Sequence, residues 1–156
     1  EVPKWGGDTL FANMHLAYEL LSEPMKAHCN NLVAVHDIAR VFARRLGKSA
    51  EELHKKYPPM RHPVVRTHPE TGQRALYVNV GFTSYIEGLS KKESEWLLDH
   101  LFKSAWNVEI QCRFRWQQGS VAFWDNRVCQ HFAVSDYFPA RRVMERVTIA
   151  GDKPFF

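Results

Sequence analysis

Two arginines near the C-terminal end of the chain, Arg142 and Arg146, have a spacing that suits anion binding. With the two-residue period of a β-strand, residues 142–149 place both arginines on one face. At a rise of roughly 3.3 Å per residue their Cα atoms lie about 13 Å apart, which leaves room for two small anions. A guanidinium stays charged at any working pH, so two of them on a partly enclosed sheet face need anionic partners. Surface salt bridges to acids such as Asp125 or Asp136 explain the same spacing equally well.

A histidine, His131, precedes the two arginines. It follows a strand-like run at residues 120–124 and the turn-rich sequence WDNR, which suits a loop at the mouth of a sheet. A single histidine more often has a structural role than a ligand role, so its chemistry stays open on this basis. Cys129 lies close by, but no base-orienting group accompanies it, and we interpret it as a small buried side chain.

Four stretches of the sequence resemble the taurine dioxygenase (TauD/TfdA) family of iron(II)- and 2-oxoglutarate-dependent oxygenases. They are GGDT at 6–9, HPVVRTHPETG at 62–72, WDNRVCQHFAVSDY at 124–137 and RRVMERVTIAGDKPF at 141–155. The resemblance runs in register from residue 5 to residue 156. It implies a mostly β fold with flanking helices, a double-stranded β-helix of the jelly-roll, cupin-like type.

The resemblance also implies an iron(II) site and a 2-oxoglutarate site. His131 matches one metal ligand, and Arg142 and Thr9 match the residues that hold the far carboxylate of 2-oxoglutarate. The family's other two ligands form a His-x-Asp pair ahead of GGDT, whereas this chain begins at Glu1. We therefore expect residues 1–156 to be the C-terminal portion of the catalytic domain, incomplete at its N-terminal side.

One tripeptide, His68-Pro69-Glu70, satisfies a His-x-Glu ligand pattern and could be paired with His131 on paper. We reject it as a metal site because Pro-Glu-Thr-Gly is typical of a hairpin turn between two strands. The family resemblance places a turn at the same position.

For the substrate, the resemblance assigns a sulfonate-binding role to Arg146 and a pocket-lining role to Phe42 and Phe82. It implies that dioxygen and 2-oxoglutarate are consumed to give succinate and carbon dioxide. The carbon next to sulfur in taurine or a related sulfonate is hydroxylated, and sulfite is released. Alkyl sulfates and aryloxyalkanoates are alternative substrates, because a guanidinium binds all of these anions by similar hydrogen bonds. A non-catalytic anion-binding β-helix protein or fragment is the alternative from another class.

Composition supports a globular protein that binds small anions. The 156 residues are 45% apolar and 13% aromatic, enough for one core and one domain. The net charge of +4 comes from scattered basic residues, which disfavours nucleic acid as a partner. No run is long enough to span a bilayer and no signal peptide pattern is present, so we expect a cytoplasmic protein without a membrane partner. A homo-oligomer is compatible with the sequence, which does not determine the oligomeric state.

The periodicity predicts the elements that must position these residues. Capping boxes at Ser49 and Ser90 predict two helix starts, the second helix having Trp96 on its apolar face. The segment at about 37–60 is expected to be a helical insert and a candidate lid, and its adjacent His36 and Asp37 are expected to face opposite sides. The remaining predicted elements are helices at 13–21 and 23–30, strands at 32–35, 108–116 and 120–124, and a hairpin of residues 62–68 and 74–79.

Overall fold

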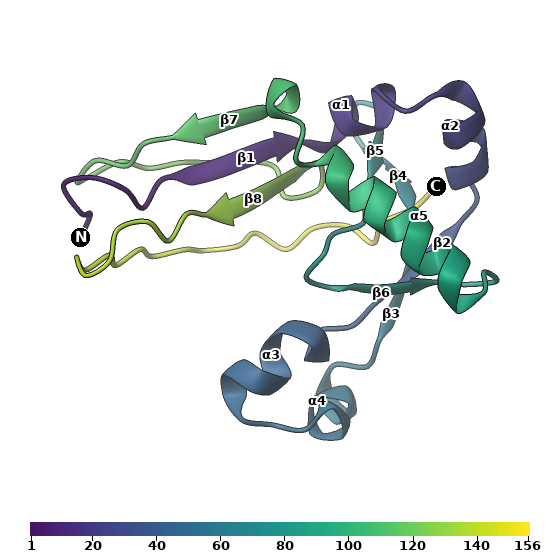
Figure 1. The fold of residues 1–156 in the computed structure, drawn as a ribbon, viewed down its shortest axis with the longest axis horizontal. Coiled ribbons are helices and arrows are strands. Elements are labelled where there is room, and N and C mark those ends of the chain that lie inside the picture. Colours follow the sequence, from purple (N-terminus) through teal and green to yellow (C-terminus); the bar gives the residue numbers. More distant parts are fainter.

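The computed structural model describes all 156 residues, and its strands form three separate antiparallel sheets (Figure 1). The β1 sheet has the order β7-β1-β8 and consists of β1 (Thr9–Asn13), β7 (Gln111–Phe114) and β8 (Cys129–Ala133). The β2 sheet has the order β3-β2-β6 and consists of β2 (Val33–His36), β3 (Met60–Pro63) and β6 (Thr83–Ile86). The third sheet is the predicted hairpin, β4 (Val65–Thr67) with β5 (Arg74–Leu76).

Five α-helices connect these sheets, and all except α3 start at a residue whose side chain caps the helix. They are α1 (Met14–Glu19), α2 (Glu23–Cys29), α3 (Ala39–Leu46), α4 (Ala50–Lys56) and α5 (Lys91–Ser104). Ser49 and Ser90 both form the predicted capping box, in which the serine and the glutamate three residues later satisfy each other's backbone N–H groups. A short 3-10 helix, η1 (Val108–Ile110), precedes β7. None of these helices has both the length and the apolar character that a bilayer crossing requires.

The core lies between α1, the β4-β5 hairpin and α5. Leu97, Leu98 and Leu101 of α5 are buried in it together with Met14 and Leu76. The prediction for Trp96 is wrong, because this side chain is 65% exposed and stacks on the ring of His100 one turn later, on the outer face of α5.

Two predicted strands, at residues 120–124 and 142–149, are absent. No hydrogen-bonded ladder forms along either segment. Their backbone hydrogen bonds are those of Ser120, in a turn with Gln117, and of Val143 with Glu1. The predicted strand at 108–116 begins as η1 and is a strand only from Gln111 to Phe114. A closed double-stranded β-helix is therefore not formed within these residues.

The C-terminal segment connects the two ends of the molecule. Figure 1 shows it running from the tip of the β1 sheet, where the N-terminus also lies, back to the β4-β5 hairpin. At the tip Val143 N–H donates to the Glu1 carbonyl at 3.0 Å, and at the hairpin Thr67 N–H donates to the Phe155 carbonyl at 2.9 Å.

Candidate active site

The GGDT turn approaches two side chains so closely that its glycines cannot be replaced without rearrangement. Gly6 and Gly7 have φ values of +74° and +70°, a region that L-residues with side chains rarely adopt. A Cβ atom on Gly6 would lie 2.8 Å from Oδ1 of Asp136, and one on Gly7 would lie 2.8 Å from Cδ of Arg142. The close approach of Asp136 and Arg142 to this turn therefore requires glycine at both positions.

Arg142 and Thr9, the predicted 2-oxoglutarate residues, both lie at this turn. Arg142 donates from Nε to the carbonyl of Gly7 at 2.8 Å, and its guanidinium lies 5.9 Å from the ring centre of Tyr137. Thr9 is 4% exposed, and its Oγ1 accepts a hydrogen bond from the Trp116 indole at 2.9 Å. A hydroxyl that accepts one bond still has its own proton to donate. The arrangement can thus offer a guanidinium and a hydroxyl near one turn.

Trp116 and Tyr137 were not identified from the sequence. Each acts through a tertiary contact, the indole on Thr9 and the ring beneath Arg142. An aromatic residue in either position is ordinarily interpreted as core, and only the partner's position reveals the role.

The salt bridges proposed for the two arginines are not formed. Asp125 binds Arg127 and His68, and Asp136 accepts from the Gly7 N–H at 2.7 Å and pairs with Arg113 at 3.3 Å. The Gly7 N–H is the main reason why the pKa of Asp136 lies below its usual value. This alternative interpretation of the arginine spacing is therefore wrong within these residues.

His131 lies within β8, not in the loop that we expected, because β1 supplies a paired neighbour as far as Ala133. It is opposite Phe11 in the sheet, and its ring centre is 5.2 Å from that of Trp124. Partial desolvation, and then the positive charge of Arg146, lower the pKa of His131 although its side chain is exposed within these residues, and a lowered pKa favours the neutral imidazole that a metal requires. In the folded chain the charge of Arg146 therefore acts on His131.

The chain alone does not fit an iron centre. It contains no group of three His, Cys, Asp or Glu side chains arranged to hold a metal ion, and His131 is the one predicted ligand. The rejected tripeptide is occupied by other contacts. His68 Nε2 lies 3.0 Å from Asp125 and its Nδ1 accepts from the Thr71 N–H at 3.2 Å, while Glu70 binds Arg127.

Phe42 and Phe82, the predicted pocket residues, come from different elements and lie together. Phe42 is on α3 and Phe82 precedes β6, and their rings stack with centres 6.4 Å apart and planes at 20°. Phe82 also lines a pocket of about 430 Å³ between the β2 sheet and the end of α4. The other lining residues are His36, Ile38, Lys56, Tyr57, Pro58, Met60 and His62.

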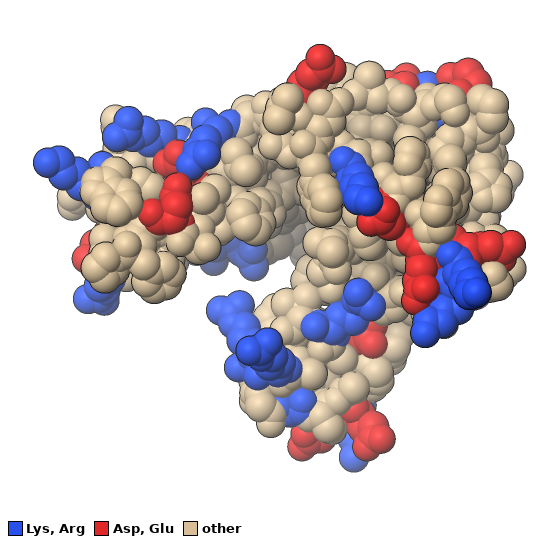
Figure 2. All heavy atoms as spheres, in the orientation of Figure 1, with Lys and Arg blue, Asp and Glu red and all other residues tan.

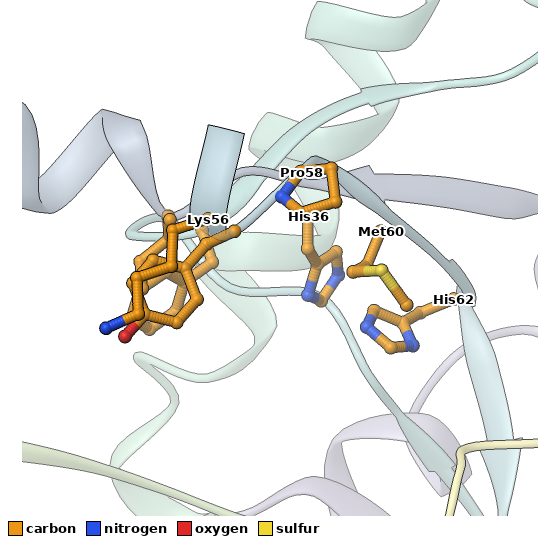
Figure 3. Close-up of a pocket in the computed structure, with 8 residues that line it drawn as sticks. His36, Lys56, Pro58, Met60 and His62 are labelled. Carbon is orange, nitrogen blue, oxygen red and sulfur yellow. The ribbon is translucent and has the colours of Figure 1, made fainter. Parts of the chain in front are cut away.

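Two histidines form one wall of this pocket, where Figure 3 shows His36, Met60 and His62 side by side and Lys56 at the other end. His36 Nε2 lies 3.1 Å from the Thr83 hydroxyl, and its ring meets that of His62 edge-on at 4.9 Å. Burial, and then the proximity of His62, lower the pKa of His36 to about 4. Nδ1 of His62 is buried without a hydrogen-bond partner. The pocket therefore has a neutral polar wall and an apolar lining.

Neighbouring candidates for catalysis have structural roles. As predicted, His36 and Asp37 face different partners, since Asp37 Oδ1 lies 2.9 Å from His54 Nε2. Burial raises the pKa of the Cys129 thiol to about 11, so this half-buried residue is not a thiolate nucleophile at neutral pH.

Basic side chains surround the region. Figure 2 shows Lys and Arg on both sides of the notch between the β1 sheet and the α3-α4 pair. Exposed basic residues of the pair without ion-pair partners include Arg40, Arg44 and Arg45 on α3. The positive electrostatic potential of these side chains attracts small anions to the notch.

Comparisons with known proteins agree with this arrangement. A family model described as "Taurine catabolism dioxygenase TauD, TfdA family" matches residues 1–148. The "Alpha-ketoglutarate-dependent sulfate ester dioxygenase" of Pseudomonas putida is 39% identical over 160 residues, which cover 97% of this chain and 53% of that protein. The chain spans about half the length of the curated relatives that it matches.

Two crystal structures share the fold. A taurine dioxygenase from Burkholderia xenovorans superposes with a TM-score of 0.76 at 42% identity, covering 89% of this chain and 45% of that one. AAD-2 in complex with Mn(II) and N-oxalylglycine superposes with a TM-score of 0.83 at 30% identity, covering 99% of this chain and 61% of that one. The chain belongs to the TauD/TfdA family of taurine catabolism dioxygenases.

Proposed function

We propose that the protein containing this chain is a 2-oxoglutarate-dependent dioxygenase that oxidises a small organic sulfonate or sulfate ester. The observation that carries the proposal is the presence of two guanidinium groups at separate places, one at the GGDT turn and one near His131. Arg142 is fixed at the GGDT turn, and Arg146 is close enough to His131 to lower its pKa. Two guanidinium groups suit a dicarboxylate co-substrate and a separate anionic substrate.

Arg142 and Thr9 would hold the far carboxylate of 2-oxoglutarate. The Nε of Arg142 already donates to Gly7, which orients the guanidinium and leaves its terminal nitrogens as donors. The Trp116 indole fixes Thr9 so that its hydroxyl proton is the remaining donor. Two donors fixed in advance reduce the entropy lost when the co-substrate binds.

Iron(II) would activate dioxygen in such an enzyme, and His131 is the residue of this chain that would hold it. One imidazole is not an iron site, so the other ligands would come from residues outside this segment. The lowered pKa of His131 favours the unprotonated imidazole that would bind the metal.

Arg146 would bind the substrate's sulfonate or sulfate group, and the Phe42-Phe82 pair would pack against its organic part. Taurine or a related sulfonate is the first candidate, with hydroxylation at the carbon next to sulfur and release of sulfite. The similarity to a sulfate ester dioxygenase supports alkyl sulfates as a second candidate. In either case the products from 2-oxoglutarate are succinate and carbon dioxide.

A non-catalytic anion-binding protein is the second candidate function. It is favoured by one observation, that no cluster of three metal-binding side chains is formed within the 156 residues. Such a protein would bind 2-oxoglutarate or a sulfonate without consuming dioxygen.

The proposal is tested with the intact protein, whose mass is first compared with the 18.2 kDa of this segment. Succinate formation is measured with iron(II), 2-oxoglutarate and, in turn, taurine, hexane-1-sulfonate, hexyl sulfate and an aryloxyacetate. Sulfite, sulfate or phenol release identifies the substrate, and omission of 2-oxoglutarate is the control. Substrate-dependent succinate with sulfite or sulfate supports the proposal. Anion binding without succinate from any compound supports the non-catalytic candidate.

A further inference from the structure

The segment that carries Arg146 is held only at its two ends. At the first end Arg142 binds the Gly7 carbonyl, and Val143 exchanges backbone hydrogen bonds with Glu1 at 3.0 and 3.1 Å. Residues 144–151 then form no hydrogen bond within the chain. The next polar contacts are those of Asp152, so the position of Arg146 depends on what holds that residue.

Asp152 is held by a buried charge. Its Oδ2 lies 2.8 Å from Nη2 of Arg66, whose side chain is 2% exposed. A guanidinium removed from water to this extent requires an anionic partner, and Asp152 is the carboxylate that provides it. The Phe155 carbonyl, three residues later, accepts from the Thr67 N–H at 2.9 Å. The second end is thus fixed to β4.

The same group of charges holds the loop that leads into β8. Arg127 donates to Asp125 at 2.6 Å and to both carboxylate oxygens of Glu70 at 2.8 and 2.9 Å, and it lies 3.9 Å from Asp152. His68 lies 3.0 Å from Asp125 on the other side. One charge cluster therefore joins the hairpin, the residues just before β8 and the C-terminal segment.

We infer that Asp152 is a positioning residue for Arg146, acting through Arg66 and Arg127 to fix Arg146 relative to His131. The inference rests on the proposed function, in which Arg146 is the substrate ligand. Arg142 is held separately by Gly7 and Tyr137. Loss of the Asp152 anchor should therefore impair use of the sulfonate or sulfate substrate and spare the binding of 2-oxoglutarate.

The test uses the intact protein and two variants. Asp152→Asn leaves the buried Arg66 without a carboxylate and is expected to lose stability. The double variant Arg66→Met/Asp152→Asn removes the unpaired charge and is expected to recover stability without restoring the anchor. In both variants kcat/KM for the substrate should fall roughly tenfold or more, because small misplacements of a positioning group are costly. The KM for 2-oxoglutarate should stay within about twofold, since its predicted ligands are untouched.

A matched control is Asp99→Asn, which breaks an exposed ion pair with Lys103 at 2.6 Å on α5. This control should change neither kcat/KM for the substrate nor the KM for 2-oxoglutarate. Amide hydrogen exchange of Thr67, whose N–H donates to the Phe155 carbonyl, is measured in parallel and should rise in both Asp152 variants and not in Asp99→Asn. Normal substrate kcat/KM in the folded double variant, or equal loss of 2-oxoglutarate binding, would overturn the inference.

The exchange measurement separates failure of the inference from failure of the proposed function. If the unaltered protein oxidises none of the sulfonates or sulfates, the proposed function is wrong, and exchange alone then decides the anchor. Faster exchange of the Thr67 amide in the double variant supports the anchor, and unchanged exchange contradicts it. If the unaltered protein is active and the two Asp152 variants have the same substrate kcat/KM as the unaltered protein, the inference is wrong and the proposed function stands.

Discussion

The two histidines of the pocket show how burial sets the charge of single residues. His36 is stacked on Tyr77 with ring centres 5.7 Å apart and meets His62 edge-on. Protonation of either ring would place a cation beside the other in a partly buried site. Burial is the first cause of the lowered pKa values of both His36 and His62. The proximity of His62 adds to it at His36, and the positive charges of Lys153 and Arg66 add to it at His62.

His36 predicts a specific loss of stability in acid. Its folded pKa of about 4 lies below the ordinary value of 6.5, so between these pH values the unfolded chain binds a proton that the folded chain does not. The free energy of unfolding should therefore fall as pH drops through this window, by at most roughly 1.4 kcal/mol per pH unit. His36→Gln should flatten the slope in denaturant unfolding between pH 6.5 and 4. His28→Gln, an exposed control on α2, should not. Equal slopes in the unaltered protein and His36→Gln would contradict this assignment.

The residues that the sequence could and could not identify differ in how they act. Arg142 and Arg146 have a spacing that suggests anions, although their specific roles came from a family resemblance and remain predictions. Trp116 binds Thr9 and Asp152 binds Arg66, and each of these partners is more than 80 positions away in the sequence. No local pattern encodes such contacts, so these residues became visible only in the folded chain.

At the scale of elements, the same capping box starts two helices that differ in how much of their surface they bury in the core. Ser90 begins α5, which buries Leu97, Leu98 and Leu101 in the core. Ser49 begins α4, in which only Leu53 is buried. Helix α5 is thus part of the cooperative core, whereas α4 covers the pocket and packs mainly on α3.

This difference predicts different consequences for the same substitution. Ser90→Ala should lower the global free energy of unfolding by about 1 kcal/mol, because it leaves backbone N–H groups of a core helix unpaired. Ser49→Ala removes the same contacts but should act mainly on local opening of α4, seen as faster amide exchange at residues 50–56. Chemical denaturation and hydrogen exchange check the pair. The same global loss in both variants would show that α4 unfolds with the core.

Helices and the β4-β5 hairpin were predictable because their signals are local, a serine with a glutamate three residues later or a Pro-Glu-Thr-Gly turn. The strands at 120–124 and 142–149 were not, because alternation describes one strand and a ladder requires two. His131 illustrates the reverse case. The sequence suggested a loop, but pairing with β1 through Phe11 makes it part of a strand.

At the scale of the whole molecule, the two segments at 120–124 and 142–149 that were expected as strands carry strongly exposed apolar side chains. Val121 and Phe123 are each 89% exposed, Val147 is 94% exposed and Ile149 is 75% exposed. Apolar surface of this extent is typical of a sheet face that another layer covers. The alternation that predicted strands there is thus real in the sequence, while the pairing that would bury it is not present within these residues.

The central claim is that Arg142 and Arg146 bind two different anions. The most direct test measures the KM for 2-oxoglutarate and the KM for the sulfonate or sulfate substrate in Arg142→Lys and Arg146→Lys, with exposed Arg141→Lys as the control. Lysine keeps the charge but loses the two-point geometry, so each affected KM should rise roughly tenfold. We predict that Arg142→Lys raises only the KM for 2-oxoglutarate and Arg146→Lys only that for the substrate. If both variants raise the same constant, or neither differs from Arg141→Lys, the two-anion site is wrong.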